Sequence, residues 1–349
     1  MYTLDNTIND LLKDDFISTY IDLIFPKVFI EMVPDDMRDI AIGELENKLT
    51  MPWGIPYMSE GIVVSANIML DLRDNDKYGF VQLWNENPKE GYFPVPNNDK
   101  NDVSLILFND SFKDNRPIAL IVPGGAYESV AISNEGMLTA EALEKKGYAV
   151  AILNYRTAPN RYPLPQIDMT LAIKYLRSNG KALGANGNEI LSVGFSAGGH
   201  LVACQSLYSD EYDEMLMREL DANYPLLAKK YSKLHAKSNK VCLSYPVTTF
   251  MGECHRPSFD NLSGGDESLL DKMCLDLHAT RAYPKTFIWH CMDDSLVPYS
   301  NSVKLHQALS RVGVDTKLML YPTGDHGIAT AEGTSAKGWV NSMVEYMRA

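Results

Sequence analysis

The chain has 349 residues, and its 32 Lys and Arg against 45 Asp and Glu give a formal net charge of −13. This acidic balance argues against binding to nucleic acid or to an anionic membrane surface, because both need an excess of Lys and Arg. With 45% hydrophobic and 22% charged residues, the composition is that of an ordinary globular protein. The length suits one large domain, or one domain with a smaller extension.

The five cysteines are scattered along the chain, and no pair has the C-x-x-C spacing of a metal or redox site. We therefore expect free, mostly buried thiols in a reducing compartment. The first residues lack the basic and apolar stretches of a signal peptide, and no run of about 18 apolar residues could span a membrane. These features predict a soluble, cytoplasmic protein.

The first part of the chain is predicted to be mainly helical. Apolar residues at helical spacing occur over 8–16 and again from Pro34 to Leu45. Residues 57–72 are apolar enough for a third helix, although the β-branched pair Val63-Val64 disfavours it. We expect residues 1–80 to form an extension, either a cap over the active site or a packing or dimerisation element, and residues 81–349 to form a catalytic domain.

A loop is predicted over 85–100, where Pro, Asn, Asp and Lys are frequent. From about residue 103, short apolar strands alternate with helices, which indicates a mostly parallel sheet with helices on both faces. Predicted strands cover 103–108, 118–122, 149–153, 190–193, 241–245, 286–290 and 317–321, and predicted helices include 139–146, 166–178 and 299–312. In such sheets the chemistry gathers at the carboxyl ends of the strands.

A nucleophile is predicted directly after the strand 190–193, in the segment Gly194-Phe195-Ser196-Ala197-Gly198. This G-x-S-x-G pattern, placed between a strand and a helix, is typical of a tight turn that exposes a strained serine. The glycines lack a Cβ, so the chain can pass close to itself. The amides at the start of the following helix would face developing negative charge.

An acyl-transfer enzyme also needs hydrogen-bond donors where the carbonyl oxygen becomes an oxyanion. The amide of Ala197, which follows the nucleophile, is one candidate donor. The second is expected in Pro123-Gly124-Gly125-Ala126-Tyr127, the loop after strand 118–122. The amide of Gly125 or that of Ala126 would serve, and the sequence does not separate the two.

The general base and the acid should follow the serine in the order acid, then histidine. His326 follows a late strand on a Gly-flanked loop and is the predicted base. Asp294 opens an Asp-x-x-Val-Pro turn after strand 286–290 and is the predicted acid. Asp293 is the fallback and a better candidate for a loop hydrogen bond, and Asp325 is expected to be solvated.

The remaining histidines have structural interpretations. His200 is expected to pack or to form a hydrogen bond beneath the serine turn, and His290 ends a buried strand. No histidine lies at a metal-ligand spacing such as H-E-x-x-H. The sequence therefore predicts a reaction without a metal or another cofactor.

Taken together, these motifs resemble the α/β-hydrolase-fold esterases described as acetyl esterase or acetylxylan-esterase-like, over roughly residues 103–345. The resemblance rests on PGGAY (123–127), NYRTAP (154–159), GFSAGGH (194–200), HRPSFDNL (255–262), DDSLVP (293–298) and GDHG (324–327). It implies an α/β-hydrolase fold, a Ser196–His326–Asp294 triad and a small acyl ester as substrate. It implies a carbohydrate alcohol more weakly.

Two departures from the family's pattern bear on the substrate. Relatives usually carry a third glycine where this chain has Ala126, and the added methyl group should narrow the acyl end of the pocket. Relatives are also shorter at the N-terminus. Tyr127 and Trp53 are predicted substrate contacts, and together with Trp84 and Tyr57 they would offer an aromatic platform to a sugar. The alternative for each is an ordinary core aromatic.

The sequence thus predicts a serine carboxylesterase that acts on short-chain, acetyl-like esters, including those of carbohydrates. Its partner would be a small-molecule ester, and a homo-oligomer is compatible with the extension. A peptidase or amidase of the prolyl-oligopeptidase or arylformamidase type is the alternative enzyme, although the chain has no room for a β-propeller. A non-catalytic binding protein with a disused triad is the alternative outside enzymes.

Overall fold

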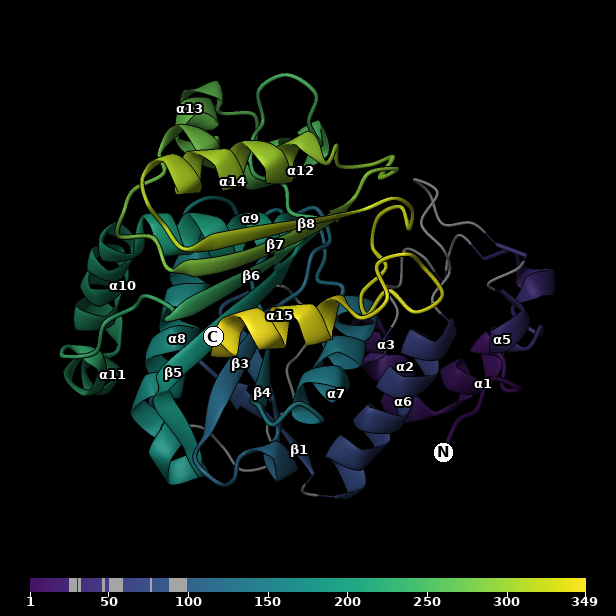
Figure 1. The fold of residues 1–349 in the computed structure, drawn as a ribbon. Coiled ribbons are helices and arrows are strands. Elements are labelled where there is room, and N and C mark those ends of the chain that lie inside the picture. The colour runs from purple at the N-terminus through teal and green to yellow at the C-terminus, as the bar shows by residue number, and fades with distance from the viewer. Residues whose placement is uncertain (25–29, 31–32, 46–47, 50–58, 76, 88–98) are drawn as a thin grey trace.

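The computed structural model describes residues 1–24, 30, 33–45, 48–49, 59–75, 77–87 and 99–349. Within these residues the chain forms an eight-stranded sheet, in the order β1-β2-β4-β3-β5-β6-β7-β8, with helices on both faces (Figure 1). β1 and β4 each pair antiparallel with β2, and the pairs from β4 to β8 are parallel. The predicted mostly parallel sheet is therefore confirmed.

Every strand expected from the apolar runs is present. The strands are β1 (Tyr78–Gln82), β2 (Ser104–Phe108), β3 (Arg116–Val122), β4 (Ala149–Asn154), β5 (Ala185–Phe195), β6 (Lys240–Ser244), β7 (Lys285–Cys291) and β8 (Thr316–Tyr321). Side chains of β3 show why these runs are apolar throughout. Leu120 joins the apolar cluster on one face, and Ile121 joins the cluster on the other.

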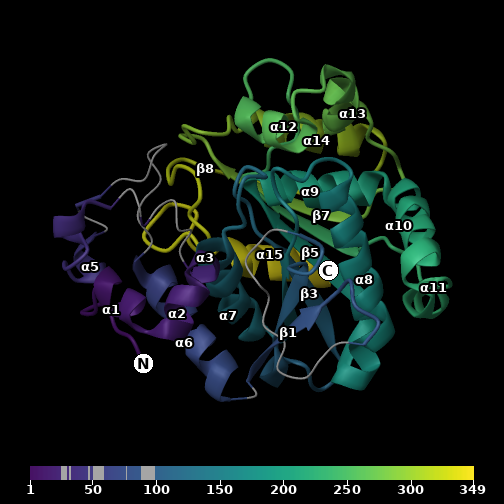
Figure 2. The ribbon, with the colours of Figure 1, turned by 180° about the vertical axis from the view of Figure 1, so that it is seen from behind.

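Two layers of helices cover the sheet (Figures 1 and 2). One layer contains α8 (Leu164–Leu183), α9 (Ser196–Leu207), α10 (Ser209–Asn223), α11 (Pro225–Tyr231), α12 (Arg256–Ser263), α13 (Leu270–Met273) and α14 (Ser300–Arg311). The other contains α7 (Leu138–Glu144), α15 (Trp339–Arg348) and the N-terminal helices α1 (Ile8–Lys13), α2 (Asp15–Thr19), α3 (Ile21–Ile24), α5 (Ile42–Leu45) and α6 (Ser59–Asp74).

The N-terminal helices are part of this second layer. Ile8, Ile17 and Ile62 are buried in the same apolar cluster as Ile121 and Ile152 of the central strands. α6 packs against η4 (Ile132–Met137), a turn of π-helix that follows the loop 123–127. The described part of residues 1–80 thus contributes to the hydrophobic core.

The N-terminal segment also differs in detail from the prediction. The helix expected over 8–16 is divided into α1 and α2, because the Asp14 side chain accepts hydrogen bonds from the amides of Phe16 and Ile17, both at 3.0 Å, and so begins a new helix. The helix expected over 57–72 is present as α6. β1 was not predicted, since it is a half-buried edge strand with Gly79 inside it.

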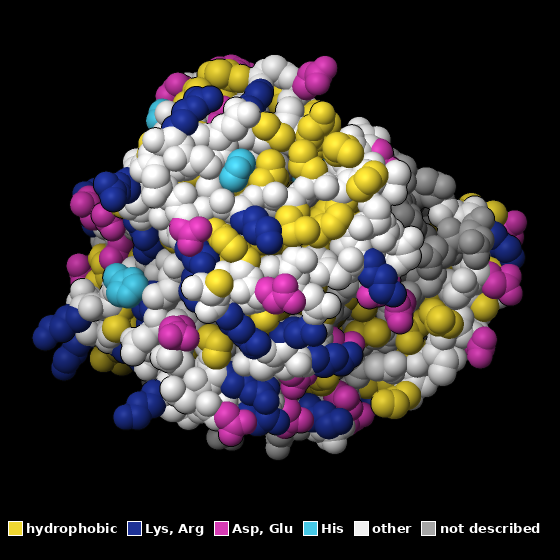
Figure 3. Space-filling view, viewed as in Figure 1, with side chains coloured by type: hydrophobic (Ala, Val, Ile, Leu, Met, Phe, Trp, Pro, Cys, Tyr) yellow, Lys and Arg dark blue, Asp and Glu magenta, His cyan; other side chains and the backbone are white. Residues whose placement is uncertain are grey.

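The surface carries charge of both signs. On the face shown in Figure 3, basic and acidic side chains are interspersed in the lower half, and apolar side chains gather near the start of α14 and the end of β8. The large exposed apolar side chains include Met292, Tyr299 and Leu320. Among the described residues, none of the helices has the length and apolar character to cross a membrane.

Candidate active site

The predicted site residues converge at the carboxyl ends of five neighbouring strands. Gly124 and Gly125 follow β3, Ser196 follows β5, Asp294 follows β7 and His326 follows β8. Tyr245, directly after β6, completes the row. The parallel pairing of these strands brings together residues that are far apart in the sequence.

Ser196 is the first residue of α9 and has a φ of +50°, a left-handed conformation that is strained for a residue with a side chain. Glycines on either side make the turn possible. A Cβ on Gly194 would lie 2.6 Å from the carbonyl oxygen of Gly198, and a Cβ on Gly198 would lie 2.2 Å from that of Val122. The close approach of three backbone segments therefore explains both glycines.

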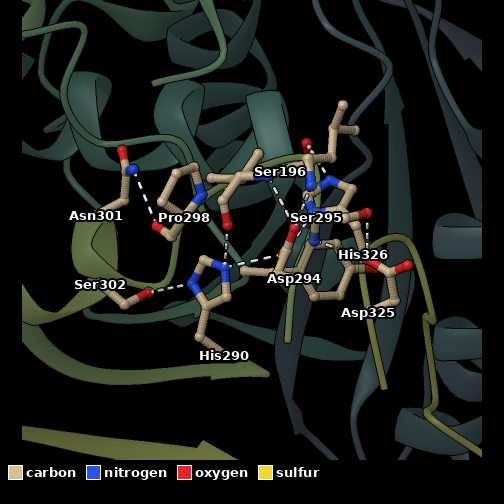
Figure 4. Close-up of polar contacts among 12 residues, drawn as sticks. Ser196, His290, Asp294, Ser295, Pro298, Asn301, Ser302, Asp325 and His326 are labelled. Atoms are coloured by element: carbon tan, nitrogen blue, oxygen red, sulfur yellow. Dashed lines mark hydrogen bonds and ion pairs between the residues drawn. The ribbon is translucent and has the colours of Figure 1, made fainter. Parts of the chain in front are cut away.

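His326 links the serine to a carboxylate (Figure 4). Its Nε2 lies 2.9 Å from Ser196 Oγ, and its Nδ1 lies 2.7 Å from Asp294 Oδ2. Because an ionised carboxylate only accepts, Nδ1 carries the proton and donates it to Asp294. The neutral imidazole then presents an unprotonated Nε2, which accepts the hydrogen bond from the serine hydroxyl.

The side chain of Asp294 is fully buried and accepts four hydrogen bonds. Besides His326, its Oδ2 accepts from His290 Nε2 at 2.9 Å, and its Oδ1 accepts from the amides of Leu296 and Val297 at 3.0 and 2.7 Å. Burial alone would raise the pKa of this carboxyl, but the two histidines hold it well below its ordinary value. Asp294 is therefore ionised across the neutral pH range.

His290 and Ser302 extend this series of hydrogen bonds beyond Asp294, which the sequence did not predict. Its Nδ1 lies 2.7 Å from Ser302 Oγ, and its Nε2 also lies 2.9 Å from the carbonyl oxygen of Val297 (Figure 4). With two acceptors facing Nε2, that nitrogen carries the proton, and Ser302 donates to Nδ1. His290 thus holds Asp294 from the side opposite His326.

The two other aspartates near this chain have separate partners. Asp293 Oδ1 accepts from the amides of Gly324 and Asp325, at 3.0 and 2.9 Å, as expected of a loop hydrogen-bonding residue. Asp325, which was expected to be solvated, is partly exposed and also has a partner within the protein. Its Oδ1 accepts from the amide and the hydroxyl of Ser295, at 2.9 and 2.8 Å, because a φ of +57° turns the side chain toward the loop after β7.

The candidate oxyanion loop has an unusual backbone. Gly125 and Ala126 have φ values of +118° and +56°, and a Cβ on Gly125 would lie 2.3 Å from the Ser129 carbonyl oxygen. Asn261 Nδ2 donates to the Ala126 carbonyl oxygen at 3.0 Å. Within the described residues, the backbone amides of Gly125 and Ala126 donate no hydrogen bond to the protein. Ala197 lies in the first turn of α9, where amides lack a partner inside the helix.

The predicted aromatic contacts have other roles. Tyr127 is only 1% exposed, and its hydroxyl donates to His200 Nδ1 at 2.8 Å, while His200 Nε2 donates to the Met273 carbonyl oxygen. Trp84 is also buried, and its Nε1 donates to Asp168. Lys100 and Arg156 lie over the Trp84 ring, with the cations 4.9 and 5.5 Å from its centroid. Trp53 and Tyr57 lie outside the described residues.

His200 matches its predicted place beneath the serine turn. Burial lowers its pKa to about 4, so it is neutral at neutral pH.

Glu135 and Tyr245 are buried beside the site and were missed by the sequence analysis. The Glu135 carboxylate accepts from the Gly124 amide at 2.5 Å and from the Tyr245 hydroxyl at 2.9 Å. The Tyr245 ring packs on the imidazole of His326, with ring centroids 4.7 Å apart. No motif marks these contacts, because Glu135 and Tyr245 are 110 positions apart.

Comparison with known families gives two matches. A model of the BD-FAE family matches residues 105–309, more than half of the chain, and this range contains the serine turn, the loop 123–127 and Asp294. A model of the prolyl oligopeptidase family matches residues 272–349, which contain Asp294 and His326.

Curated relatives include xylan-active proteins. Endo-1,4-beta-xylanase B of Butyrivibrio fibrisolvens is 29% identical over 279 residues, which are 76% of this chain and 41% of that protein. An acetylxylan esterase of Xylanibacter ruminicola is 27% identical over 209 residues, which are 59% of this chain and 40% of that protein. The chain spans about two fifths of the length of these relatives.

Solved structures share the fold. An acetyl ester-xyloside bifunctional hydrolase from Caldicellulosiruptor lactoaceticus superposes with a TM-score of 0.63 at 26% identity, over 77% of this chain and 95% of that chain. A truncated carbohydrate esterase from gut microbiota superposes with a TM-score of 0.57 at 18% identity, over 71% of this chain and 90% of that chain. These likenesses confirm the α/β-hydrolase fold and the resemblance to esterases drawn from the motifs.

Proposed function

This chain belongs to the BD-FAE family, and from that premise we propose that it is a serine carboxylesterase that hydrolyses short acyl esters. The observation that carries the proposal is the hydrogen-bonded chain from Ser196 through His326 to Asp294. The Gly124 backbone approaches Ser196, and within the described residues the next two amides, of Gly125 and Ala126, have no hydrogen-bond partner. The names of the relatives, which include esterases and carboxylesterases, support the class of reaction.

The proposed reaction uses only groups of this chain. Ser196 Oγ attacks the ester carbonyl while His326 Nε2 takes the hydroxyl proton. The amides of Ala197 and of Gly125 or Ala126 hold the oxyanion. His326 then gives its proton to the leaving alcohol, and a water molecule deacylates Ser196 by the same steps. Asp294 orients the imidazole and stabilises its cation.

The proposed substrates are acetyl esters of carbohydrates. On the acyl side, we expect the methyl group of Ala126 to narrow the space beside the candidate oxyanion amides, which would favour a small acyl group. On the alcohol side, the support comes from relatives named for acetylated xylan or xyloside substrates. We therefore place acetylated xylo-oligosaccharides first among the compounds to test.

The test is acetate release from acetylated xylo-oligosaccharides, together with a p-nitrophenyl ester series from acetate to octanoate. We expect kcat/KM to fall as the acyl chain lengthens. We expect Ser196→Ala to abolish hydrolysis of both the p-nitrophenyl esters and the acetylated sugars. Rates that rise with chain length would refute the short-acyl proposal. Activity on p-nitrophenyl acetate without acetate release from the sugars would refute the proposed carbohydrate substrate and leave the short-acyl esterase proposal standing.

A peptidase or amidase is the second candidate, and the match of residues 272–349 to the prolyl oligopeptidase family favours it. This match covers the acid and the base but not Ser196 or the loop 123–127. Peptide p-nitroanilides distinguish the two candidates, because an amide leaving group demands stronger protonation by His326. We expect turnover of the ester and none of the p-nitroanilides, whereas turnover of a p-nitroanilide that Ser196→Ala abolishes would favour the peptidase or amidase.

We further propose that the N-terminal extension is a packing element that supports η4 and, through it, the loop 123–127. The support for this role is the contact of α6 with η4. There, Gly61 lies so close to Asn134 that an added Cβ would be 2.5 Å from Asn134 Oδ1. A cap or a dimerisation element remains the alternative for residues 1–80.

A further inference from the structure

Glu135 is a buried carboxylate beside the nucleophile that the reaction described above does not use. It is 4% exposed and lies on η4. A buried carboxylate is costly to the fold unless strong hydrogen bonds compensate it. Its two hydrogen-bond partners among the described residues are Gly124, on the oxyanion side, and Tyr245, on the side of the base.

The first partner belongs to the oxyanion side. The Gly124 amide donates to Glu135 Oε2 at 2.5 Å, and the Gly124 carbonyl oxygen accepts from the amide of Ala131, at the start of η4, at 3.0 Å. Both peptide groups of Gly124 are thereby fixed, directly before the amides of Gly125 and Ala126. A Cβ on Gly124 would lie 2.8 Å from Ser196 Cβ and 2.9 Å from Glu135 Oε2. The carboxylate and the nucleophile therefore flank the same glycine.

The second partner belongs to the side of the base. The Tyr245 hydroxyl donates to Glu135 Oε1 at 2.9 Å and accepts from the Ala329 amide at 3.1 Å. The tyrosine ring meets the imidazole of His326 at 62°. Tyr245 itself has a φ of +36°, a left-handed conformation that the surrounding contacts must maintain. Glu135 thus holds the Tyr245 ring, against which the imidazole of His326 packs.

We propose that Glu135 is a positioning residue of the esterase reaction, which sets the oxyanion loop through Gly124 and the general base through Tyr245. The proposal rests on the function proposed above. Both partners donate to the carboxylate, which favours its ionised form. Burial raises the pKa of Glu135, and the Gly124 amide, the field of His326 and the Tyr245 hydroxyl act in the opposite direction. The anion would also stabilise the His326 cation, alongside Asp294.

The test replaces Glu135 by Gln. Glutamine keeps the size of the side chain but exchanges one acceptor oxygen for an NH2 group, so it can accept from Gly124 or from Tyr245 and not from both. Glu141→Gln is the matched control, because Glu141 lies on the adjacent α7 with its side chain 39% exposed. Tyr245→Phe is the second variant, since it keeps the ring on His326 and removes the hydroxyl with its hydrogen bonds to Glu135 and to the Ala329 amide. Active sites are counted by complete titration with a fluorophosphonate.

We expect Glu135→Gln to lower kcat per titrated site by about 10- to 1,000-fold, comparable with the loss of an oxyanion donor, with KM changed less than threefold. Tyr245→Phe should lower kcat less, because the bond to Gly124 remains. Among the residues that the structure describes, the charged or titratable groups that interact with His326 include Asp294, Glu135, Tyr245 and His255. Loss of the Glu135 anion should therefore move the acidic limb of the kcat/KM profile to lower pH.

A purely structural role would give another result. Glu135→Gln would then lower the melting temperature or the number of titrated sites, with kcat per site and the acidic limb as in the wild type, and this would overturn the proposal. Failure of the proposed function is distinguishable, because the wild type itself would then hydrolyse no ester and Ser196 would take no label.

Discussion

Asp293 and Asp294 are adjacent in the chain, yet one carboxylate binds the backbone of the His326 loop and the other binds the His326 side chain. Asp293 accepts from the backbone amides of Gly324 and Asp325, before the histidine. Asp294 accepts from the imidazole itself and is buried, whereas Asp293 is exposed. Asp293 therefore fixes the backbone of the loop, and Asp294 fixes the orientation of the His326 ring.

This division predicts different results for the two asparagine variants. Asp294→Asn should lower kcat by about 10⁴-fold, because an amide no longer enforces the tautomer of His326 that leaves Nε2 unprotonated. Asp293→Asn keeps an acceptor oxygen for Gly324 and Asp325 and should cost less than about tenfold. Steady-state kinetics on p-nitrophenyl acetate measure both. A larger loss in Asp293→Asn would reverse the proposed acid assignment.

Ala126→Gly should widen the range of acyl groups. The substitution removes the methyl group next to the candidate oxyanion amides and relieves a φ of +56°. We expect kcat/KM for butyrate and hexanoate esters to rise relative to acetate, and the melting temperature to hold or increase. An unchanged ratio would show that Ala126 does not limit the acyl site.

Gly61→Val tests the link between the extension and the site. The added Cβ meets the mobile end of Asn134, 2.5 Å away, which an alanine can push aside. The two further methyl groups of valine must displace η4, which carries Glu135. We expect Gly61→Ala to retain activity and Gly61→Val to lose at least tenfold in kcat. Equal activity of the two variants, with the extension folded, would remove the proposed support of η4.

Stability should fall at acid pH through His200. Burial lowers its pKa from 6.5 to about 4, so between these values the unfolded chain binds a proton that the folded chain does not. Its contribution is therefore complete above about pH 6.5 and is lost as the pH falls toward 4, by up to about 1.4 kcal/mol per pH unit. His255, with a pKa of about 4, acts with the same sign.

Urea unfolding at several pH values measures this slope. His200→Gln, which cannot titrate, should flatten it while leaving the part due to His255. A slope identical to that of the wild type would show that His200 is protonated in the folded state as readily as in the unfolded chain.

Local patterns account for the parts of the structure that the sequence predicted. Continuous apolar runs mark strands such as β3 and β4, because both faces of a parallel sheet are covered. Ser196 is recognised from five consecutive residues and the elements beside them. His326 and Asp294 follow from chain order along the sheet and from the family resemblance.

Contacts between distant segments account for what was missed. The bond from Tyr245 to Glu135 spans 110 positions, and that from Tyr127 to His200 spans 73, and neither leaves a local pattern. The hydrogen bonds from Ser295 to Asp325 span 30 positions, and the sequence does not reveal the positive φ of Asp325. The helix predicted over 8–16 is divided because Asp14 ends α1 and its side chain caps the start of α2.

The central claim is that Ser196 is the nucleophile of an esterase, and one paired experiment tests it. Wild type and Ser196→Ala are compared on p-nitrophenyl acetate, and the residue labelled by a fluorophosphonate is identified by mass spectrometry. We predict label on Ser196 alone and a loss of about 10⁶ in kcat in the variant. Undiminished hydrolysis by Ser196→Ala, or label on another residue of the wild type, would contradict the account.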